Sequence, residues 1–278
     1  MGSAMGRFYQ ARLVRYVVHP FFESGRPLVF AHRGGAGLAP ENTLAAFDRG
    51  LQLGADGLEL DVRLSRDGVV VVHHDPTLER TTNLRGPLAG FEADELARAD
   101  AGYRFGLLDT RPFRGSGIGI PRLDWVLDRY PETRLIIEMK ENAVTLARAT
   151  LDAIRRAGAL GRVCLGSVGL RAIQAVRAME PAVATSAAKE EVRWALYRSW
   201  VRWPVTRVAY GGYQVPEIAG STRVVSPRFL AAAHRAGLAV QVWTVNAEDD
   251  ARRLLSWGVD ALITDRPDVI VPLCASRR

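Results

Sequence analysis

The stretch GLELDVRLSRDGVVVVHHD, residues 57–75, contains two apolar runs joined by the turn sequence SRDG. Ser, Asp and Gly favour tight turns, and the spacing between Leu64 and Val70 is too short for the crossover helix that connects two parallel strands. We therefore expect residues 57–64 and 69–74 to form an antiparallel hairpin.

The hairpin predicts which polar side chains share a face. With the turn centred on its Arg-Asp pair, Asp61 would lie opposite Val72 and Glu59 opposite His74, within one place for a bulge. Side chains two positions apart on a strand point the same way. We expect Glu59 and Asp61 on one face together with His74, and His73 on the other.

Elsewhere, short β-rich runs alternate with helical patterns, which is typical of βα units around a parallel sheet. The nine strand candidates are residues 27–32, 56–64, 69–74, 134–140, 162–167, 182–186, 205–210, 238–246 and 261–265. Because 69–74 is the return strand of the hairpin, eight candidates remain for the sheet. This predicts an α/β fold, a TIM-type (β/α)8 barrel with a β-hairpin near the second strand and a short irregular insertion at about 83–120 over one mouth.

The composition fits a globular chain of this size. The chain has 278 residues, of which 48% are apolar and 24% charged, and no run approaches the ~20 apolar residues of a spanning helix. We expect residues 1–26 to be a basic amphipathic N-terminal segment without a secretory signal, and residues 27–278 to be a single barrel domain. Two cysteines are too few for a disulfide framework and predict a reducing, cytoplasmic location.

The net charge of +7 favours anionic partners, and phosphate esters, nucleic acids and acidic lipid surfaces all qualify. The positive charge is spread along the chain, and the aromatic residues form no recognised nucleic-acid-binding module. We therefore expect no nucleic-acid partner.

Carboxylates that face into a barrel are costly to bury unless a cation pairs with them. The run RLIIEMK adds Glu138 and Lys140, again two positions apart at a strand end. Glu59, Asp61 and Glu138 could hold a hard divalent ion, Mg²⁺ or Ca²⁺, with waters and a substrate phosphate completing its shell. The alternative is a Glu138–Lys140 salt bridge, with arginines satisfying the Glu-x-Asp pair.

The run FAHRGG, residues 30–35, places His32 and Arg33 beside glycine backbone at the end of the first strand. Arginine next to flexible backbone is typical of phosphate binding. A lone histidine at a strand end is most often structural, but two histidines with three carboxylates, a lysine and an arginine favour a catalytic site. Asp75 could orient a neighbouring side chain or start a turn with Pro76.

The motifs HRGG…PENTLAAF, LELDVRLSRDGVVVVHHDPTLERTT, EMK, VWTVN and GVDALITDRP follow one another between about Leu28 and Pro267. In this order and density they resemble the glycerophosphodiester phosphodiesterase family. The resemblance implies a TIM-type barrel with metal ligands Glu59, Asp61 and Glu138. It also implies catalytic histidines His32 and His74, phosphate contacts Arg33 and Lys140, and an aromatic, Trp243, beside the substrate.

Some positions allow two interpretations. In PENT, Asn42 or Thr43 is expected to cap the first helix, and Glu41 to brace either the metal shell or Arg33. Trp243 faces either the substrate or the core. Two departures from the family pattern are Val168, where phenylalanine is frequent, and Ala261, where glycine is usual; the first predicts a wider wall beside the site.

Together with the resemblance, these residues predict metal-dependent hydrolysis of glycerophosphodiesters to glycerol phosphate and an alcohol by two-histidine acid/base catalysis. One alternative is the same chemistry on lysophospholipids at a membrane surface, a lysophospholipase D-like activity. A further alternative is a non-catalytic sensor of phosphate or lipid headgroups. Two proton-transfer residues argue against a sensor, because binding alone does not need them.

The run RWALYRSWVRW, residues 193–203, interleaves three tryptophans with three arginines. Val192, Leu196, Trp200 and Trp203 follow helical spacing. This predicts either a core-facing stripe with exposed arginines or an interfacial helix at an acidic leaflet.

The N-terminal run GRFYQARLVRYVVHPFF, residues 6–22, repeats this pattern. Basic side chains line one face of a predicted helix, and apolar side chains ending at Phe21 lie near another. Together with residues 193–203, it predicts peripheral membrane contact in addition to a cytoplasmic location.

Overall fold

The computed structural model describes residues 19–106, 110–206 and 208–275. Parallel strands form a barrel in the order β6-β5-β4-β2-β1-β11-β10-β7, and a bridge between Ser186 and Gly212 joins the two ends of this order. The barrel strands are β1 (Leu28–His32), β2 (Gly57–Leu64), β4 (Arg134–Met139), β5 (Val163–Ser167), β6 (Ala184–Thr185), β7 (Gly212–Pro216), β10 (Ala239–Trp243) and β11 (Ala261–Thr264). The predicted TIM-type barrel is confirmed.

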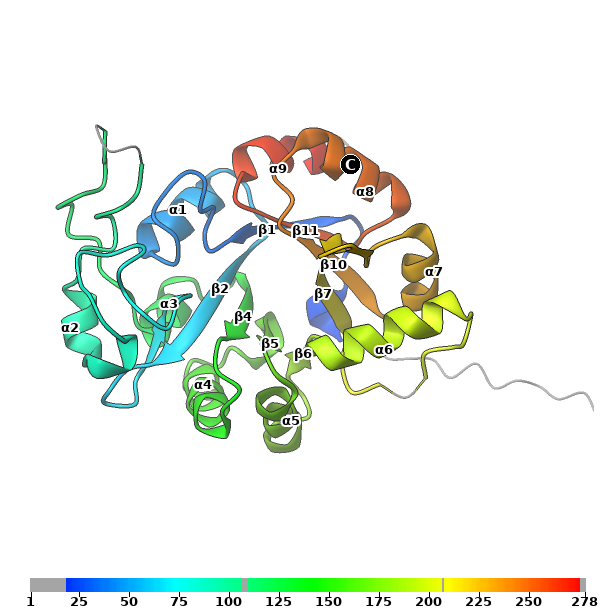
Figure 1. Ribbon diagram of the computed structural model, residues 1–278, viewed down its shortest axis with the longest axis horizontal. Helices are drawn as coiled ribbons and strands as arrows, with labels where there is room; N and C mark the ends of the chain where they lie inside the picture. The colour runs from blue at the N-terminus through cyan, green and yellow to red at the C-terminus, as the bar shows by residue number, and fades with distance from the viewer. Residues whose placement is uncertain (1–18, 107–109, 207, 276–278) are drawn as a thin grey trace, which may run out of the picture.

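Helices alternate with the strands and surround the barrel (Figure 1). They are α1 (Leu44–Gln52), α2 (Ala93–Ala97), α3 (Leu123–Arg129), α4 (Val144–Arg156), α5 (Leu170–Met179), α6 (Lys189–Trp200), α7 (Pro227–Arg235), α8 (Glu248–Trp257) and α9 (Pro267–Ala275). Short 3-10 helices are η1 (Pro20–Phe22), η2 (Leu88–Gly90) and η3 (Leu160–Arg162). No helix in the described ranges combines the length and the apolar character needed to cross a bilayer.

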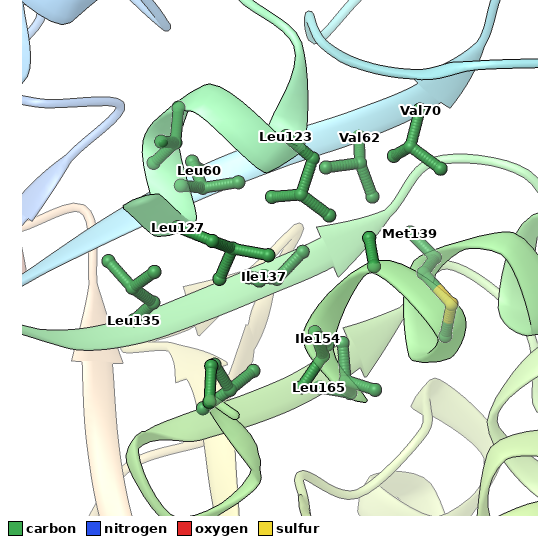
Figure 2. Packing of buried hydrophobic residues seen from close by; sticks show 14 of the residues in the cluster. Leu60, Val62, Val70, Leu123, Leu127, Leu135, Ile137, Met139, Ile154 and Leu165 are labelled. Atoms are coloured by element: carbon green, nitrogen blue, oxygen red, sulfur yellow. The ribbon is translucent and has the colours of Figure 1, made fainter. Parts of the chain in front are cut away.

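The main core lies between the strands and the outer helices. Leu60 and Val62 of β2 and Ile137 of β4 are fully buried in one cluster with Leu123 and Leu127 of α3, and Figure 2 shows this packing. The apolar side chains of β2 thus point outward to the helices, which leaves the alternate positions of the strand to the barrel interior.

The predicted hairpin is present, with its register one place from the expected one. β3 (Val70–Val72) pairs antiparallel with β2, and Val62 rather than Asp61 lies opposite Val72. The Ser65 N–H donates to Val69 O at 3.0 Å, and Gly68 has a φ of 77°. The turn therefore has three loop residues, with glycine in the left-handed position, and its centre shifts by half a residue.

The seventh barrel strand was predicted at residues 205–210, and this prediction is wrong. The strand is β7, Gly212–Pro216. A Cβ at Gly212 would lie 2.8 Å from Ala239 O and 3.0 Å from the Phe22 ring. Glycine is needed where the chain passes this close to its neighbours, so the barrel strand begins with Gly212. A small hairpin, β8 (Ile218–Ala219) with β9 (Thr222–Arg223), follows β7.

The floor of the barrel is closed by the two phenylalanines of η1. Phe21 and Phe22 are 1% and 8% exposed, and the Phe21 ring stacks on Phe30 with centroids 6.0 Å apart. Other members of this cluster are Leu28, Ala184, Ala239 and Ala261, which begin β1, β6, β10 and β11. The prediction that Phe21 lies on a lipid-facing surface is therefore wrong. Residues 6–18 of the predicted amphipathic segment lie outside the described residues.

The predicted core stripe on residues 193–203 is also wrong in part. The buried face of α6 is formed by Ala195, Leu196 and Ser199. Trp200 and Trp203 are 53% and 65% exposed instead. The buried positions follow the helical period of 3.6 residues, and a four-residue spacing drifts off that face within two turns.

Candidate active site

Side chains at the carboxyl ends of the barrel strands line a cavity of about 650 Å³. Its charged and ionisable lining residues are His32, Arg33, Glu59, His74, Glu138, Lys140, Lys189 and Arg193. Of the sequence-predicted set, Trp243 also lines the cavity. The described residues of the insertion, 83–106 and 110–120, contribute none of the lining residues; helix α2 packs against the hairpin through Leu96, beside Val71. The insertion was predicted to cover one mouth of the barrel, and its described residues do not cover the mouth that contains this cavity.

Three carboxylates converge at one point of this site. Asp61 of β2 is paired in register with Glu138 of β4, and Glu59 lies two residues earlier on β2. One oxygen from each of the three carboxylates lies within 4.8 Å of the others. Glu59 and Asp61 are 5% and 1% exposed. The shared face predicted for the two β2 carboxylates is therefore confirmed.

Two cations contact this carboxylate cluster. Lys140 Nζ lies 3.1 Å from Asp61 Oδ1 and 2.8 Å from Glu138 Oε2, and Arg33 Nε lies 3.2 Å from Asp61 Oδ2. Burial opposes the ionisation of Asp61, but Lys140 and then Arg33 outweigh it, so the pKa of Asp61 is lowered. The Glu138–Lys140 salt bridge considered from the sequence is present, and it forms part of the cluster.

The Glu59 carboxylate lacks the described ion pairs with Lys140 and Arg33 that the Asp61 carboxylate has. Its described ion-pair contact is His32 Nε2 at 3.8 Å, and it accepts a hydrogen bond from the Arg33 backbone N–H at 3.1 Å. Burial, and then the Asp61 carboxylate, raise its pKa to about 7. A buried carboxylate with a raised pKa beside two others is a set of hard oxygen donors that fits a divalent cation.

Both cavity histidines are held by a carboxylate on the same ring nitrogen. His32 Nδ1 lies 2.6 Å from Asp265 Oδ1, and His74 Nδ1 lies 2.6 Å from Asp75 Oδ1. Such a contact fixes the ring orientation and the tautomer, and it leaves Nε2 of each ring to face the cavity. Asp75 therefore orients its neighbour, which was one of the two interpretations of this residue.

His73 is excluded from the cavity. It is 5% exposed, and its Nε2 lies 3.2 Å from Thr77 O. Burial lowers its pKa. The Asp61 carbonyl accepts the His73 N–H at 2.9 Å, so the two residues lie opposite each other. β3 ends at Val72, so His74 lies outside the strand. Its side chain therefore reaches the cavity through the path of the following loop, and not through the alternation of side chains along a strand.

An ionic network ties Arg33 to the second histidine. Arg33 Nη1 donates to Glu41 Oε1 at 2.9 Å, and two Arg80 nitrogens donate to the same carboxylate at 2.7 Å each. Arg80 Nε also donates to Asp75. Burial opposes the ionisation of Asp75, but the hydrogen bonds from Arg80 and His74 outweigh it and lower the pKa to about 2. Glu41 thus braces Arg33, one of its two predicted roles.

Asn42 and Thr43 have separate tasks. Thr43 caps α1, because its side chain accepts from Ala46 N–H at 3.2 Å. Asn42 is 2% exposed and donates from Nδ2 to Asp61 Oδ2 at 2.9 Å, while its Oδ1 accepts from Asp61 N–H at 3.2 Å. It adopts a left-handed φ of 58° to reach this position. It fixes the orientation of a carboxylate in the cluster.

The opposite wall of the cavity is rich in apolar side chains, beside Lys189 and Arg193 of α6. Val168, Val192, Leu196, Val215 and Val224 line it. Trp243, at the end of β10, is 42% exposed and faces the cavity, not the core. This wall contains Val168, which the sequence predicted to widen the site because phenylalanine is frequent at this position in the family that the sequence resembles.

Two supporting residues, Asp265 and Arg80, had no predicted role, and Asn42 was expected only as a possible cap of the first helix, not as a partner of Asp61. A signal existed for Asp265, because the last strand of a closed barrel lies beside the first, and Ala31 is paired with Thr264. The next residues of the two strands are then His32 and Asp265. No comparable signal places Arg80, which lies in a loop.

Residues 32–269 match the model of the Glycerophosphoryl diester phosphodiesterase family. A Glycerophosphodiester phosphodiesterase from Caldanaerobacter subterraneus subsp. tengcongensis is 32% identical over 253 residues, which cover 89% of this chain and 98% of the relative. The chain belongs to this family.

Solved structures of this family share the fold. The phosphodiesterase domain of a Mycobacterium tuberculosis protein matches with a TM-score of 0.78 at 22% identity, over 91% of this chain and 100% of that one. A phosphodiesterase from Oleispira antarctica, solved in complex with the product sn-glycerol-3-phosphate, matches with a TM-score of 0.71 at 26% identity, over 89% and 96%.

Proposed function

We propose that the protein hydrolyses glycerophosphodiesters to glycerol phosphate and an alcohol, with one divalent metal ion and two histidines. One observation carries this proposal: two imidazoles, each held by a carboxylate at Nδ1, enter the same cavity as three converging carboxylates. The reaction class is supported by the family and by the product bound in the Oleispira antarctica relative.

Glu59, Asp61 and Glu138 would hold the ion, which is Mg²⁺ or Ca²⁺ because all three donors are hard oxygens. When bound, such an ion withdraws electron density from a phosphate oxygen as a Lewis acid. The formal charges support this arrangement: the three carboxylates and one phosphodiester monoanion are balanced by Arg33, Lys140 and a dication. Without the dication, Glu59 has a pKa of about 7.

Arg33 and Lys140 would bind the non-bridging phosphate oxygens. Both line the cavity, where their positive charges lie beside the carboxylate cluster. A phosphodiester resists attack because its negative charge repels nucleophiles. Fixed cations at these oxygens lower that repulsion and stabilise the charge that develops in the transition state.

His32 and His74 would transfer protons at Nε2. One neutral imidazole removes the proton of the attacking hydroxyl, which belongs to water or to the substrate itself. The other ring, as imidazolium, gives its proton to the departing alkoxide, which leaves as an alcohol. Trp243 would contact the substrate beside these groups, and Glu41 keeps Arg33 in place.

Lysophospholipids are a second candidate substrate class, and the apolar wall with Val168, Leu196 and Val215 favours them, because an acyl chain needs such a surface. A pure headgroup sensor is disfavoured, because it would not need two oriented imidazoles. We also place the protein in the cytoplasm, which its two buried thiols support. We treat residues 27–278 as one catalytic domain, which the family match over 32–269 supports.

The test of the metal assignment is isothermal calorimetry with Mg²⁺ and Ca²⁺, combined with glycerophosphocholine hydrolysis. Glu59→Gln, Asp61→Asn and Glu138→Gln should each lose metal affinity and activity together, by at least about tenfold. Unchanged metal affinity in all three variants would refute the ligand set.

The test of the histidine assignment uses the same two measurements. His32→Gln and His74→Gln should reduce kcat by roughly 100-fold or more and leave metal affinity nearly unchanged. His73→Gln is the matched control, since it is the adjacent histidine outside the cavity. If His73→Gln were inactive and His74→Gln active, the catalytic histidine would be His73 and not His74.

A further inference from the structure

Exposed apolar side chains are concentrated on one part of the molecule. Among the described residues, nine large apolar side chains are strongly exposed, and five of them lie within residues 194–203. These five, which we call the α6 surface, are Trp194 (66%), Tyr197 (54%), Trp200 (53%), Val201 (53%) and Trp203 (65%). A contiguous exposed cluster of this kind indicates a binding surface, whereas isolated exposed residues do not.

The remaining exposed apolar residues mostly lie close to the same region. Val168 and Trp243 line the cavity, and Ile218 belongs to the β8–β9 hairpin, whose Ala219 and Thr222 also line it. Trp125, on α3, is the exception, and α3 lies on the other side of the barrel from α6 in Figure 1. The apolar exposure therefore follows the substrate cavity.

Arginines dominate the charge of the α6 surface, and a single-residue exception beside it is Glu190, at the start of α6, which shares a pocket with Arg193, Trp194 and Tyr197. Arg193, Arg198 and Arg202 are interleaved with the aromatic residues, and residues 192–216 contain no Asp or Glu. In the part of the chain that the structure describes, none of these three arginines takes part in an ion pair, whereas Arg177, which packs nearby, is paired with Glu191 at 2.7 Å. An anionic partner would complement this face.

The same helix forms part of the cavity wall. Val192, Arg193 and Leu196 line the cavity, while the next residues outward, Trp194 and Tyr197, are exposed and meet edge to face with ring centroids 6.3 Å apart. A surface that covers α6 would thus lie directly beside the cavity. Tryptophan, tyrosine and arginine are the side chains that favour the headgroup zone of a bilayer, where a ring can be buried and a polar tip stays hydrated.

We propose that the α6 surface docks the protein on acidic lipid bilayers, with the cavity at the lipid surface. The second part of this inference, delivery of a lysophospholipid headgroup from the bilayer to the site, rests on the proposed function. The docking itself does not, because it depends only on the aromatic and arginine side chains of residues 193–203.

The test is co-sedimentation with phosphatidylcholine vesicles that contain phosphatidylglycerol. The unmodified protein should bind them, and pure phosphatidylcholine vesicles or high salt should weaken binding. The Trp194→Ser/Trp200→Ser/Trp203→Ser variant should bind at least about tenfold more weakly. Arg198→Ser and Arg202→Ser should each reduce binding to the acidic vesicles by roughly fivefold and leave binding to neutral vesicles unchanged.

Trp125→Ser is the matched control, because it removes an exposed tryptophan that is next to an arginine but outside the α6 surface. It should bind vesicles as the unmodified protein does. In case the triple variant does not fold, quenching of the tryptophan emission of the unmodified protein by vesicles with brominated acyl chains gives an independent readout, and no quenching would refute insertion.

Two further outcomes would overturn the proposal. One is equal vesicle binding by the triple variant and the unmodified protein. The other is a dimer of the unmodified protein in light scattering that is lost in the triple variant, with no vesicle binding, because the surface would then join two copies of the chain.

Delivery of substrate is tested separately by kinetics. The triple variant should lose kcat/KM for vesicle-bound lysophosphatidylcholine and keep it for dissolved glycerophosphocholine. If neither substrate is hydrolysed by the unmodified protein, the proposed function fails while the vesicle-binding result still stands. If both substrates are affected equally, α6 is a structural element of the site and delivery is refuted.

Discussion

Asp265 illustrates how much of the site depends on residues that do not touch the reacting atoms. It holds Nδ1 of His32 at 2.6 Å and is itself held by Asn246 Nδ2 at 2.9 Å. Burial opposes protonation of His32, but Glu59 and then Asp265 outweigh it, so the pKa of His32 is raised. Asp265 thus fixes the orientation of this ring and, after Glu59, adds to its affinity for a proton.

Asp265→Asn should lower kcat by roughly 10- to 100-fold and lower the pKa of His32, because it removes a negative charge and keeps the shape. Metal affinity should not change. The measurements are steady-state kinetics and an NMR titration of the histidine rings. Asp260→Asn is the matched control, since Asp260 accepts from His234 at 2.9 Å without touching the cavity. An unchanged His32 titration in Asp265→Asn would contradict this role.

Glu59 gives the metal-free protein a pH-dependent stability. Its folded pKa is about 7, against an ordinary value of 4.5, so between these values the folded protein holds a proton that the unfolded chain has released. The free energy of unfolding therefore falls as the pH rises through this range, and the loss is complete above the folded pKa.

Glu59→Gln removes this loss, so the metal-free variant should be more stable than the unmodified protein at about pH 8, by on the order of 2 kcal/mol. At about pH 4 the two proteins should be nearly equal, because the protonated carboxyl resembles the amide. Urea denaturation in the presence of a chelator, repeated across pH, measures the difference. Glu138→Gln, whose carboxylate is paired with Lys140, should show no such gain; parallel pH curves for Glu59→Gln and the unmodified protein would contradict the assignment.

At the scale of elements, the loop after β1 is built on left-handed backbone. Arg33, Gly34 and Gly35 have φ values of 51°, 88° and 99°. A Cβ at Gly34 would lie 2.7 Å from Ala46 Cβ and 2.8 Å from the Phe47 ring. The loop can therefore carry Arg33 into the site only because α1 packs directly on a residue without a side chain.

Gly34→Ala should lower the free energy of unfolding by about 2–5 kcal/mol, since it combines left-handed strain with a steric clash. Gly68→Ala is the control, because its φ is 77° and an added Cβ would meet nothing within 4 Å; it should cost about 1–2 kcal/mol. Chemical denaturation of both variants tests the difference. Equal losses would mean that the contact with α1 is unimportant.

The elements also show where sequence patterns stop being informative. The hairpin, the barrel and the carboxylate face of β2 follow from strand periodicity and turn chemistry. β7 did not follow, because the run at 205–210 has the side chains of a strand, while Gly212–Pro216 begins with glycine and ends with proline. Its position is set by the close approach of Gly212 to Ala239 and Phe22, which no local pattern encodes.

The same limit applies to His74 and Trp200. The hairpin register lies one place from the centred expectation, within the allowance made for a bulge, and His74 reaches the cavity because β3 ends before it. The stripe that included Trp200 had plausible spacing, but the side chain is exposed. Alternation predicts the direction of a side chain within an element, and it loses meaning where the element ends.

At the scale of the whole molecule, the barrel depends on a segment that precedes its first strand. Phe21→Ala should lower the free energy of unfolding by about 3–5 kcal/mol, because it empties the floor beneath Phe30. The folded variant should keep its kcat, since the floor lies at the strand ends opposite the site. Trp125→Ala, an exposed aromatic, should cost less than about 1 kcal/mol by the same thermal or urea measurement. A comparable loss from both variants would show that Phe21 is not a core residue.

The contact between His32 and Asp265 spans 233 positions and joins the first barrel strand to the last. A nascent chain that has emerged from the ribosome as far as β10 already carries all three carboxylates of the cluster and both imidazoles. The carboxylate that orients His32 is still missing at that stage, and so is the strand that closes the ring. Hydrolytic competence should therefore appear only after β11 and Asp265 have left the ribosome, which would protect the cell's phosphodiesters from partly folded copies of the enzyme.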